Sequence, residues 1–259
     1  MGRLAQKCAP NNYQYPHETI RECVRDDVRY SLDISDYMQY CIYFRVSAEP
    51  RDKLYDLVRN GTTVIDIGTN IGETLLGFAR VNTDGLSIGF EPVPFLYEKA
   101  LGNIRLNAFG NIRLENLGLS DMEQTLSFQQ SNENNTGGIY LSAEGDPTKG
   151  VVNVIPFDDY VALNHIKKIS LIKIDVEGFE MKVLRGATET LRRLRPDLFV
   201  EINDGFLRRQ GSSAGELFLF LSGLGYELRD AESGAPFPPT TNVEGRHFDI
   251  IASVRKGGT

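Results

Sequence analysis

The chain has 259 residues, of which 41% are hydrophobic and 24% are charged, and its net charge at pH 7 is −7. These are globular proportions, and the length suits one sizeable domain or a domain with an extension. The acidic balance disfavours nucleic acid as a partner, because its phosphates would be repelled. No apolar run is long enough to cross a membrane, and the opening residues lack the apolar core of a signal peptide.

The three cysteines, Cys8, Cys23 and Cys41, all lie in the first fifth of the chain without C-x-x-C spacing. An odd count without that spacing disfavours a disulfide framework and a zinc site, although a single bridge is an alternative. Free thiols are typical of a reducing compartment, so we expect a cytoplasmic protein. The sequence leaves the oligomeric state open.

The hydrophobic pattern divides the chain near residue 60. Residues 1–60 predict an N-terminal extension or cap of short helices, with a strand pair, that covers the core or walls a substrate pocket. Beyond it, the patterns predict strands at 62–68, 85–92, 112–121, 125–130, 151–156, 170–178, 197–204, 226–232 and 246–256, helices at 71–81, 94–109, 157–166, 179–196 and 212–226, and a long loop at 131–150. This alternation predicts an α/β fold with a mostly parallel sheet, helices on both faces and an antiparallel hairpin at the edge.

The segment V-I-D-I-G-T-N-I-G, residues 64–72, joins the first core strand to the first core helix. Gly68 and Gly72 would permit a tight turn and a close backbone approach to a ligand, although a turn without a ligand would look the same. Ligands bind at the carboxyl ends of the strands in such sheets. Thr69 and Asn70 are neutral polar residues that suit the amino-acid end of a cofactor.

Asp66, in the strand just before this turn, favours a positively charged cofactor. A dinucleotide places its pyrophosphate at the helix N-terminus, and a carboxylate ~4 Å away would repel it by about 4 kcal/mol at an effective dielectric of ~20. S-adenosylmethionine carries a sulfonium and an ammonium, which the carboxylate would attract. Glu91, with Pro92 beside it, ends the next strand, where an acid binds the ribose hydroxyls of either cofactor. Leu119 and Ser120, at the end of the third strand, are candidates to meet the adenine.

In this order and spacing, V-I-D-I-G-T-N-I-G, F-E-P and L-I-K-I-D-V-E-G-F-E resemble the FkbM family of S-adenosylmethionine-dependent methyltransferases. The resemblance covers roughly residues 63–203, and the stretches N-N-T-G-G and I-P-F-D-D-Y are also similar to that family. It implies a Rossmann-like class I methyltransferase domain, here residues 61–259. It also implies methyl transfer to oxygen, typically a hydroxyl of a sugar, polyketide or other small molecule, without fixing the acceptor.

A second group of acids follows the fourth core strand, in I-K-I-D-V-E-G-F-E. Asp175 and Glu177 are candidates to orient or deprotonate an acceptor hydroxyl, and Asp175 also lies where it could contact the cofactor. Glu180 suits the N-terminus of the following helix. Glu201 and Asn203 end the neighbouring strand, so together these side chains form an oxygen-rich cluster that could hold Mg²⁺.

His247 alternates with Asp249 on one face of a late strand. It is a candidate base near neutral pH, and a structural role is the alternative. The long loop at 131–150 could be a lid over a substrate. Aromatic residues of the extension could wall the acceptor pocket or pack on the sheet: Tyr37, Tyr40, Tyr43 and Phe44.

Two other functions fit the same residues. One is a nucleotide-binding oxidoreductase with a divergent glycine loop, and the other is a non-catalytic module that keeps the cofactor fold. The acidic balance and the absence of an N-P-P-Y motif argue against methylation of amino groups on nucleic-acid bases.

Overall fold

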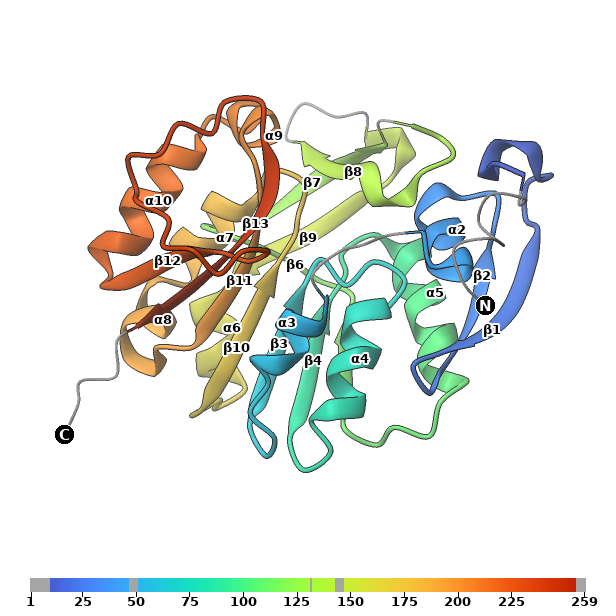
Figure 1. The fold of residues 1–259 in the computed structure, drawn as a ribbon, viewed down its shortest axis with the longest axis horizontal. Coiled ribbons are helices and arrows are strands. Elements are labelled where there is room, and N and C mark those ends of the chain that lie inside the picture. Colours follow the sequence, from blue (N-terminus) through green and yellow to red (C-terminus); the bar gives the residue numbers. More distant parts are fainter. Residues whose placement is uncertain (1–9, 47–50, 131, 143–146, 255–259) are drawn as a thin grey trace.

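The computed structural model describes residues 10–46, 51–130, 132–142 and 147–254. Its central sheet has seven strands (Figure 1), which are, in spatial order, β12 (Tyr226–Asp230), β13 (His247–Val254), β11 (Asp197–Asn203), β10 (Ile169–Ile174), β3 (Thr63–Ile67), β4 (Leu86–Phe90) and β5 (Ile112–Glu115). Strands β11 to β5 run parallel, and β13 is antiparallel to both β11 and β12. The predicted α/β fold with an antiparallel edge hairpin is confirmed.

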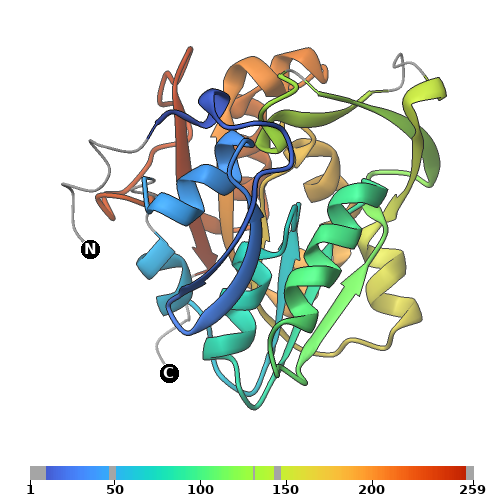
Figure 2. The same ribbon diagram turned by 90° about the vertical axis from the view of Figure 1, so that its right-hand side faces the viewer.

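Helices cover both faces of the sheet, as predicted (Figures 1 and 2). One face carries α3 (Arg51–Asp56), α4 (Glu73–Val81) and α5 (Pro94–Arg105), and the other carries α6 (Phe157–Leu163), α7 (Glu180–Gly186), α8 (Thr188–Leu194) and α10 (Ala214–Gly223). Neighbouring residues of β3 show the reason. Val64 packs with Phe78 of α4, whereas Ile65 belongs to the cluster of Phe157 and Phe218, because successive side chains of a strand point to opposite faces.

A second, four-stranded sheet consists of β6 (Gly118–Ser120), β9 (Val151–Pro156), β7 (Gln124–Gln130) and β8 (Ile139–Ser142), in that order. The predicted strand at 112–121 is therefore wrong as one unit, because β6 leaves the central sheet to pair with β9. The predicted loop at 131–150 is also corrected. It contains η2 (Thr136–Gly138), β8 and η3 (Pro147–Lys149). Strand β8 forms there because it pairs with β7.

The single helix predicted at 179–196 is two helices, α7 and α8. Asp158 of α6 accepts hydrogen bonds from the backbone N–H groups of Glu189 and Thr190, at 2.9 and 2.7 Å. These amides are among the unpaired donors of a new helix start, so the tertiary contact begins α8 where the periodicity showed no break.

The N-terminal extension contains η1 (Asn12–Gln14), a hairpin of β1 (Ile20–Arg25) and β2 (Val28–Asp33), and helix α2 (Tyr37–Phe44). Figure 2 shows the hairpin lying across the face that carries α4 and α5. Leu32 of the hairpin and Ile42 of α2 share a hydrophobic cluster with Leu76 and Leu96 of those helices. The division of the chain at residue 60 stays a prediction.

Two features bear on the expected environment of the protein. Cys23 and Cys41 form no disulfide, and Cys8 lies outside the described residues. Among the residues that the structure describes, no helix combines the length and apolarity needed to span a bilayer.

Candidate functional site

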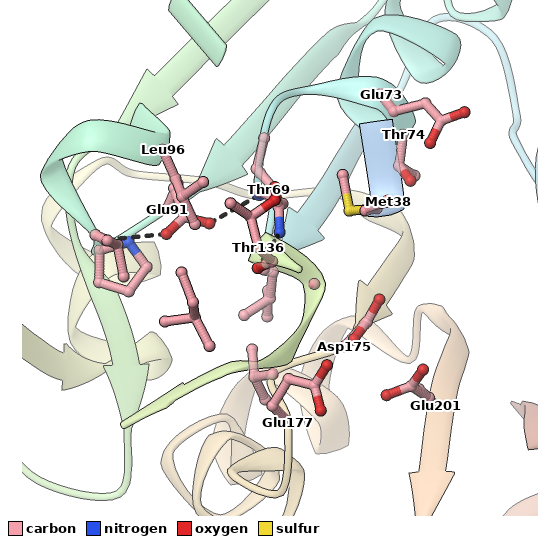
Figure 3. Close-up of a pocket in the computed structure, with 18 of the residues that line it drawn as sticks. Met38, Thr69, Glu73, Thr74, Glu91, Leu96, Thr136, Asp175, Glu177 and Glu201 are labelled. Carbon is pink, nitrogen blue, oxygen red and sulfur yellow. Dashed lines mark hydrogen bonds between the residues drawn. The ribbon is translucent and has the colours of Figure 1, made fainter. Parts of the chain in front are cut away.

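A cavity of about 410 Å³ lies at the carboxyl ends of β3, β4, β10 and β11, where the sequence predicted a ligand (Figure 3). Three groups of residues line it. The turns after β3 and β4 supply Gly68, Thr69, Asn70, Glu91 and Pro92, and β6 supplies Leu119. The acidic side supplies Lys173, Asp175, Glu177, Glu201 and His247, and α2 with the η2 segment supplies Tyr37, Met38, Cys41, Asn135, Thr136 and Gly137.

The turn after β3 needs glycine at two positions. Gly68 has φ +84°, and a Cβ placed there would lie 1.8 Å from the backbone oxygen of Asp175. Gly72 has φ +92° and precedes α4 as its N-cap, outside the set of lining residues. Asn70 also has a positive φ, +51°. The turn therefore lies directly against the end of β10 and presents its backbone to the cavity.

Glu91 connects this turn to the end of β4. Its side chain is buried and accepts hydrogen bonds from the backbone N–H groups of Asn70, at 2.7 Å, and Val93, at 2.9 Å. Burial raises the pKa of Glu91 to about 7, although the two backbone donors act in the opposite direction. Each carboxylate oxygen keeps a second lone pair, so Glu91 can accept further hydrogen bonds from a ligand in the cavity.

Asp66 does not face the cavity, and the prediction that its charge meets the ligand there is wrong. Its side chain is fully buried, and Oδ1 lies 3.6 Å from Nζ of Lys173, its register partner on β10. Lys173 also contacts Asp175 Oδ2 at 3.0 Å and donates to the backbone oxygen of Gly68 at 3.3 Å. Burial raises the pKa of Asp66 to about 6, against the opposing effect of Lys173. Because the positive charge of Lys173 lies beside Asp66, the negative charge of Asp66 alone does not select the cofactor.

Replacing Lys173 with methionine is expected to lower the free energy of unfolding by about 3–5 kcal/mol, because Asp66 and Asp175 would lose the cation that both contact, and buried Asp66 would have to take up a proton or keep an unpaired charge. Denaturant unfolding measures the change. The double variant K173M/D66N should regain part of the loss, because it removes that charge as well. Additive losses in the double variant would contradict a direct pairing of the two groups.

The acidic side of the cavity holds three carboxylates close together. Ligand oxygens of Asp175, Glu177 and Glu201 lie within 4.8 Å of one another. Burial, followed by repulsion from Glu201 and Asp175, raises the pKa of Glu177 to about 9. Burial and Asp175 likewise raise the pKa of Glu201. Such a cluster favours a cationic or proton-donating group in its centre.

His247 joins this cluster through Glu201, since Nε2 and Oε1 lie 2.7 Å apart. The hydrogen bond to Glu201 raises the pKa of His247, so the ring favours its protonated form near neutral pH. Asn203, which was expected to complete an oxygen-rich metal site, does not join it. Its side chain instead accepts from the backbone N–H of Phe206 and caps α9 (Asp204–Arg209).

Replacing Glu177 with glutamine is expected to raise Tm at pH 9 by about 2–4 °C, on the order of 1 kcal/mol in a chain of this size, and to change it little at pH 5. Between its ordinary pKa of 4.5 and its folded pKa of about 9, Glu177 keeps a proton that the unfolded chain has lost. Its contribution to the free energy of unfolding therefore falls as pH rises through that window. Calorimetric scans at both pH values check this. The exposed Glu98 of α5, changed to glutamine, should show no such pH dependence, and an equal gain at pH 5 would contradict the assignment.

Ser120 lies elsewhere than predicted. It is fully buried in β6 beneath α7, where its backbone oxygen would lie 1.9 Å from a Cβ on Gly186, so the prediction that it meets an adenine in the cavity is wrong. Glu180 is buried and accepts from the backbone N–H groups of Val176 and Gly178, which orders the turn after β10. Of the aromatic residues of α2, Tyr37 lines the cavity, whereas Tyr40 packs 4.6 Å from Phe44, measured between ring centroids.

Sequence reasoning missed Lys173, and it offered the contribution of α2 and of residues 135–137 only as alternatives, a wall of aromatic residues and a lid at 131–150. The signal for Lys173 was present, because a lysine inside the mostly apolar and buried strand β10 needs buried partners. For residues 135–137 the family-like stretch N-N-T-G-G was the available signal, although the whole segment reads as a loop.

The strand order, with β13 inserted antiparallel between β11 and β12, and the cavity at the strand ends define a Rossmann-like methyltransferase fold. The chain belongs to the FkbM methyltransferase family, whose domain model (Methyltransferase FkbM domain) matches residues 66–228.

Two curated relatives and one solved structure illustrate the similarity. The chain is 26% identical over 176 residues to Methyltransferase 1 of Beauveria bassiana, covering 59% of this chain and 70% of that one. It is 31% identical over 140 residues to the hexuronic acid methyltransferase AglP of Haloferax volcanii, covering 54% of this chain and 55% of AglP. The structure of M. jannaschii TYW2 in complex with AdoMet matches with a TM-score of 0.47 and 14% identity, covering 92% of this chain and 86% of that chain.

Proposed function

We propose that the protein transfers a methyl group from S-adenosylmethionine to a hydroxyl of a small molecule or sugar. One observation carries the proposal. Glu91 and the glycine turn border the same cavity as Asp175, Glu177 and Glu201. A hydroxyl-binding acid and a cluster that suits positive charge therefore border one ligand space. That combination fits a nucleoside with a cationic sulfur better than a pyrophosphate.

The donor groups fit this cofactor residue by residue. Glu91 would hold the ribose hydroxyls, and Gly68 leaves the backbone open where a Cβ could not be placed. Asn70 Oδ1 is buried without a hydrogen-bond partner among the described residues, so it suits the ammonium of the amino-acid end. Pro92 and Leu119 are the candidate neighbours of the adenine. When bound, the cofactor supplies a methyl group on a positively charged sulfur.

The acidic side would position the acceptor and manage its proton. Holding the hydroxyl in line with the methyl contributes most, up to ~7–11 kcal/mol in well-oriented reactions. Asp175 and Glu177 are the proposed orienting residues, and the Glu201–His247 pair is an additional place for the proton that the hydroxyl loses. The high pKa of Glu177 makes it a strong base once it is ionised.

A sugar-type acceptor is supported by the relative AglP, which is a hexuronic acid methyltransferase. The proposal includes a Mg²⁺ ion held by Asp175, Glu177 and Glu201. The oxygens of these three carboxylates lie close enough together to bind one metal ion. Treatment with a chelator and readdition of Mg²⁺ tests that part separately. The cytoplasmic location stays a prediction from the cysteines.

The experiment that tests the function combines binding with turnover. Calorimetry should detect binding of S-adenosylmethionine and of S-adenosylhomocysteine. Fluorescence titration should detect no binding of NADH. Methyl transfer is then followed with labelled cofactor over hydroxyl-bearing sugars and polyketides. NADH binding instead would support the oxidoreductase. Cofactor binding without turnover over the panel would favour a non-catalytic module.

A further inference from the structure

The cavity is roofed by two segments that are far apart in sequence. We use the name roof for two segments. They are residues 36–41, which are the N-cap and the start of α2, and residues 134–138 around η2. Three roof residues from α2 and three from the segment around η2 line the cavity: Tyr37, Met38, Cys41, Asn135, Thr136 and Gly137. The family match begins at residue 66, so the α2 half of the roof lies outside it.

Asp36 joins the two halves of the roof. It is buried, and its carboxylate accepts from the backbone N–H of Thr136 at 2.6 Å and from Thr136 Oγ1 at 3.1 Å. The same side chain caps α2 by accepting from the backbone N–H of Gln39 at 3.0 Å. The backbone N–H of Tyr37 also donates to Asn134 O, at 2.8 Å. One carboxylate therefore fixes both the start of α2 and the η2 turn.

The roof is tied in turn to the ligand-facing residues. Asn70 Nδ2 donates to the backbone oxygen of Thr136 at 3.1 Å, and the backbone N–H of Asn70 donates to Glu91 Oε2 at 2.7 Å. A continuous series of hydrogen bonds thus runs from Asp36 through Thr136 and Asn70 to Glu91. Figure 3 shows Thr136 and Met38 of the roof among the residues that line the cavity, together with Glu91.

We propose that the N-terminal segment is part of the ligand site and that Asp36 is a positioning residue. Asp36 holds η2 against the glycine turn, and through Thr136 it fixes the side chain of Asn70. The cofactor site is then incomplete without residues that precede the family domain. This inference rests on the proposed function for the identity of the ligand, and on the hydrogen bonds above for the role of Asp36.

The variant Asp36→Ser tests the proposal in the full chain. Serine is a good N-cap, so the start of α2 is kept, but its side chain is too short to bridge to Thr136. We expect affinity for S-adenosylhomocysteine, measured by calorimetry, to fall at least tenfold. Backbone amides of residues 135–138 should exchange faster, with Tm within a few degrees of wild type. Thr136→Val removes only the hydroxyl bond and should reduce affinity about two- to fivefold.

Asp33→Ser is the matched control. Asp33 also orders the turn before α2, by accepting from the backbone N–H and the hydroxyl of Ser35, but none of its described hydrogen bonds reaches η2. Affinity within twofold of wild type in Asp36→Ser, or an equal loss in Asp33→Ser, would overturn the role of Asp36. Failure of the wild-type chain to bind S-adenosylhomocysteine would instead remove the proposed function, and this inference with it.

Discussion

Alanine at position 68 is expected to abolish detectable binding of S-adenosylhomocysteine and to lower the free energy of unfolding by roughly 2–5 kcal/mol. The positive φ of Gly68 costs an L-residue about 1–2 kcal/mol, and the added Cβ would lie 1.8 Å from the Asp175 backbone oxygen. Relief of that overlap, about 1–3 kcal/mol for an overpacked site, must move the turn or the end of β10. Calorimetry and denaturant unfolding give both quantities.

Gly61 offers a matched control for this prediction. It has a similar φ of +77°, but a Cβ placed there would meet nothing within 4 Å. Gly61→Ala should therefore cost only the conformational part, about 1–2 kcal/mol, and leave ligand binding intact. Equal effects of the two substitutions would show that the close approach of Gly68 to Asp175 is unimportant.

Glutamine at position 91 is expected to weaken binding of S-adenosylhomocysteine by about 100-fold, which corresponds to about 2.7 kcal/mol. The amide would lose the charge that receives the ribose hydroxyls. It would also turn an NH₂ group toward one of the two backbone N–H donors that Glu91 now accepts from. A hydrogen bond to a charged group contributes about 1.5–3 kcal/mol, so the expected loss corresponds to about one such bond. Calorimetry measures the loss.

The pH dependence of binding supplies a second readout for Glu91. Because burial raises its pKa to about 7, the carboxylate form grows between pH 6 and pH 8. Wild-type affinity should rise across this range, since the ligand prefers the charged form, and the slope in Glu91→Gln should be clearly smaller. Glu115→Gln is the control. Glu115 lies on the adjacent strand β5 and accepts from the Tyr160 hydroxyl, outside the described cavity lining. A wild-type slope that persists in Glu91→Gln would refute the assignment.

Local pattern was sufficient for most of the central sheet and for the turns that border the cavity. β-branched runs followed by glycine predicted β3 and β4, and a positive φ at Gly68 follows from its position in a tight strand-to-helix turn. The same reasoning failed at β6 and at α7–α8. Ile112–Glu115 and Gly118–Ser120 read as one strand, because periodicity does not tell which sheet a segment joins.

The acids show the same limit in the candidate site. Asp66 and Glu91 both belong to the strand ends that border the cavity, and both were expected to face the ligand. Glu91 does line the cavity, whereas Asp66 is fully buried beside Lys173. The direction of a side chain at a strand end depends on its neighbours in the sheet, and β10 follows β3 by about a hundred residues. The sequence shows that position 66 carries a carboxylate, but it does not predict that Lys173 lies beside it.

The sequence by itself determined most strands and helices of the central sheet, the glycine turn and the presence of acids at or near the ends of its strands, because these depend on residues close together along the chain. Only the tertiary structure decided which of those acids share one cavity. It paired Glu201 with His247 and Asp66 with Lys173, and it brought Thr136 to both Asp36 and Asn70. The physical reason is that these contacts depend on the order of strands in the sheet and on the packing of the N-terminal segment. Neither leaves a periodic signal in the residues that meet.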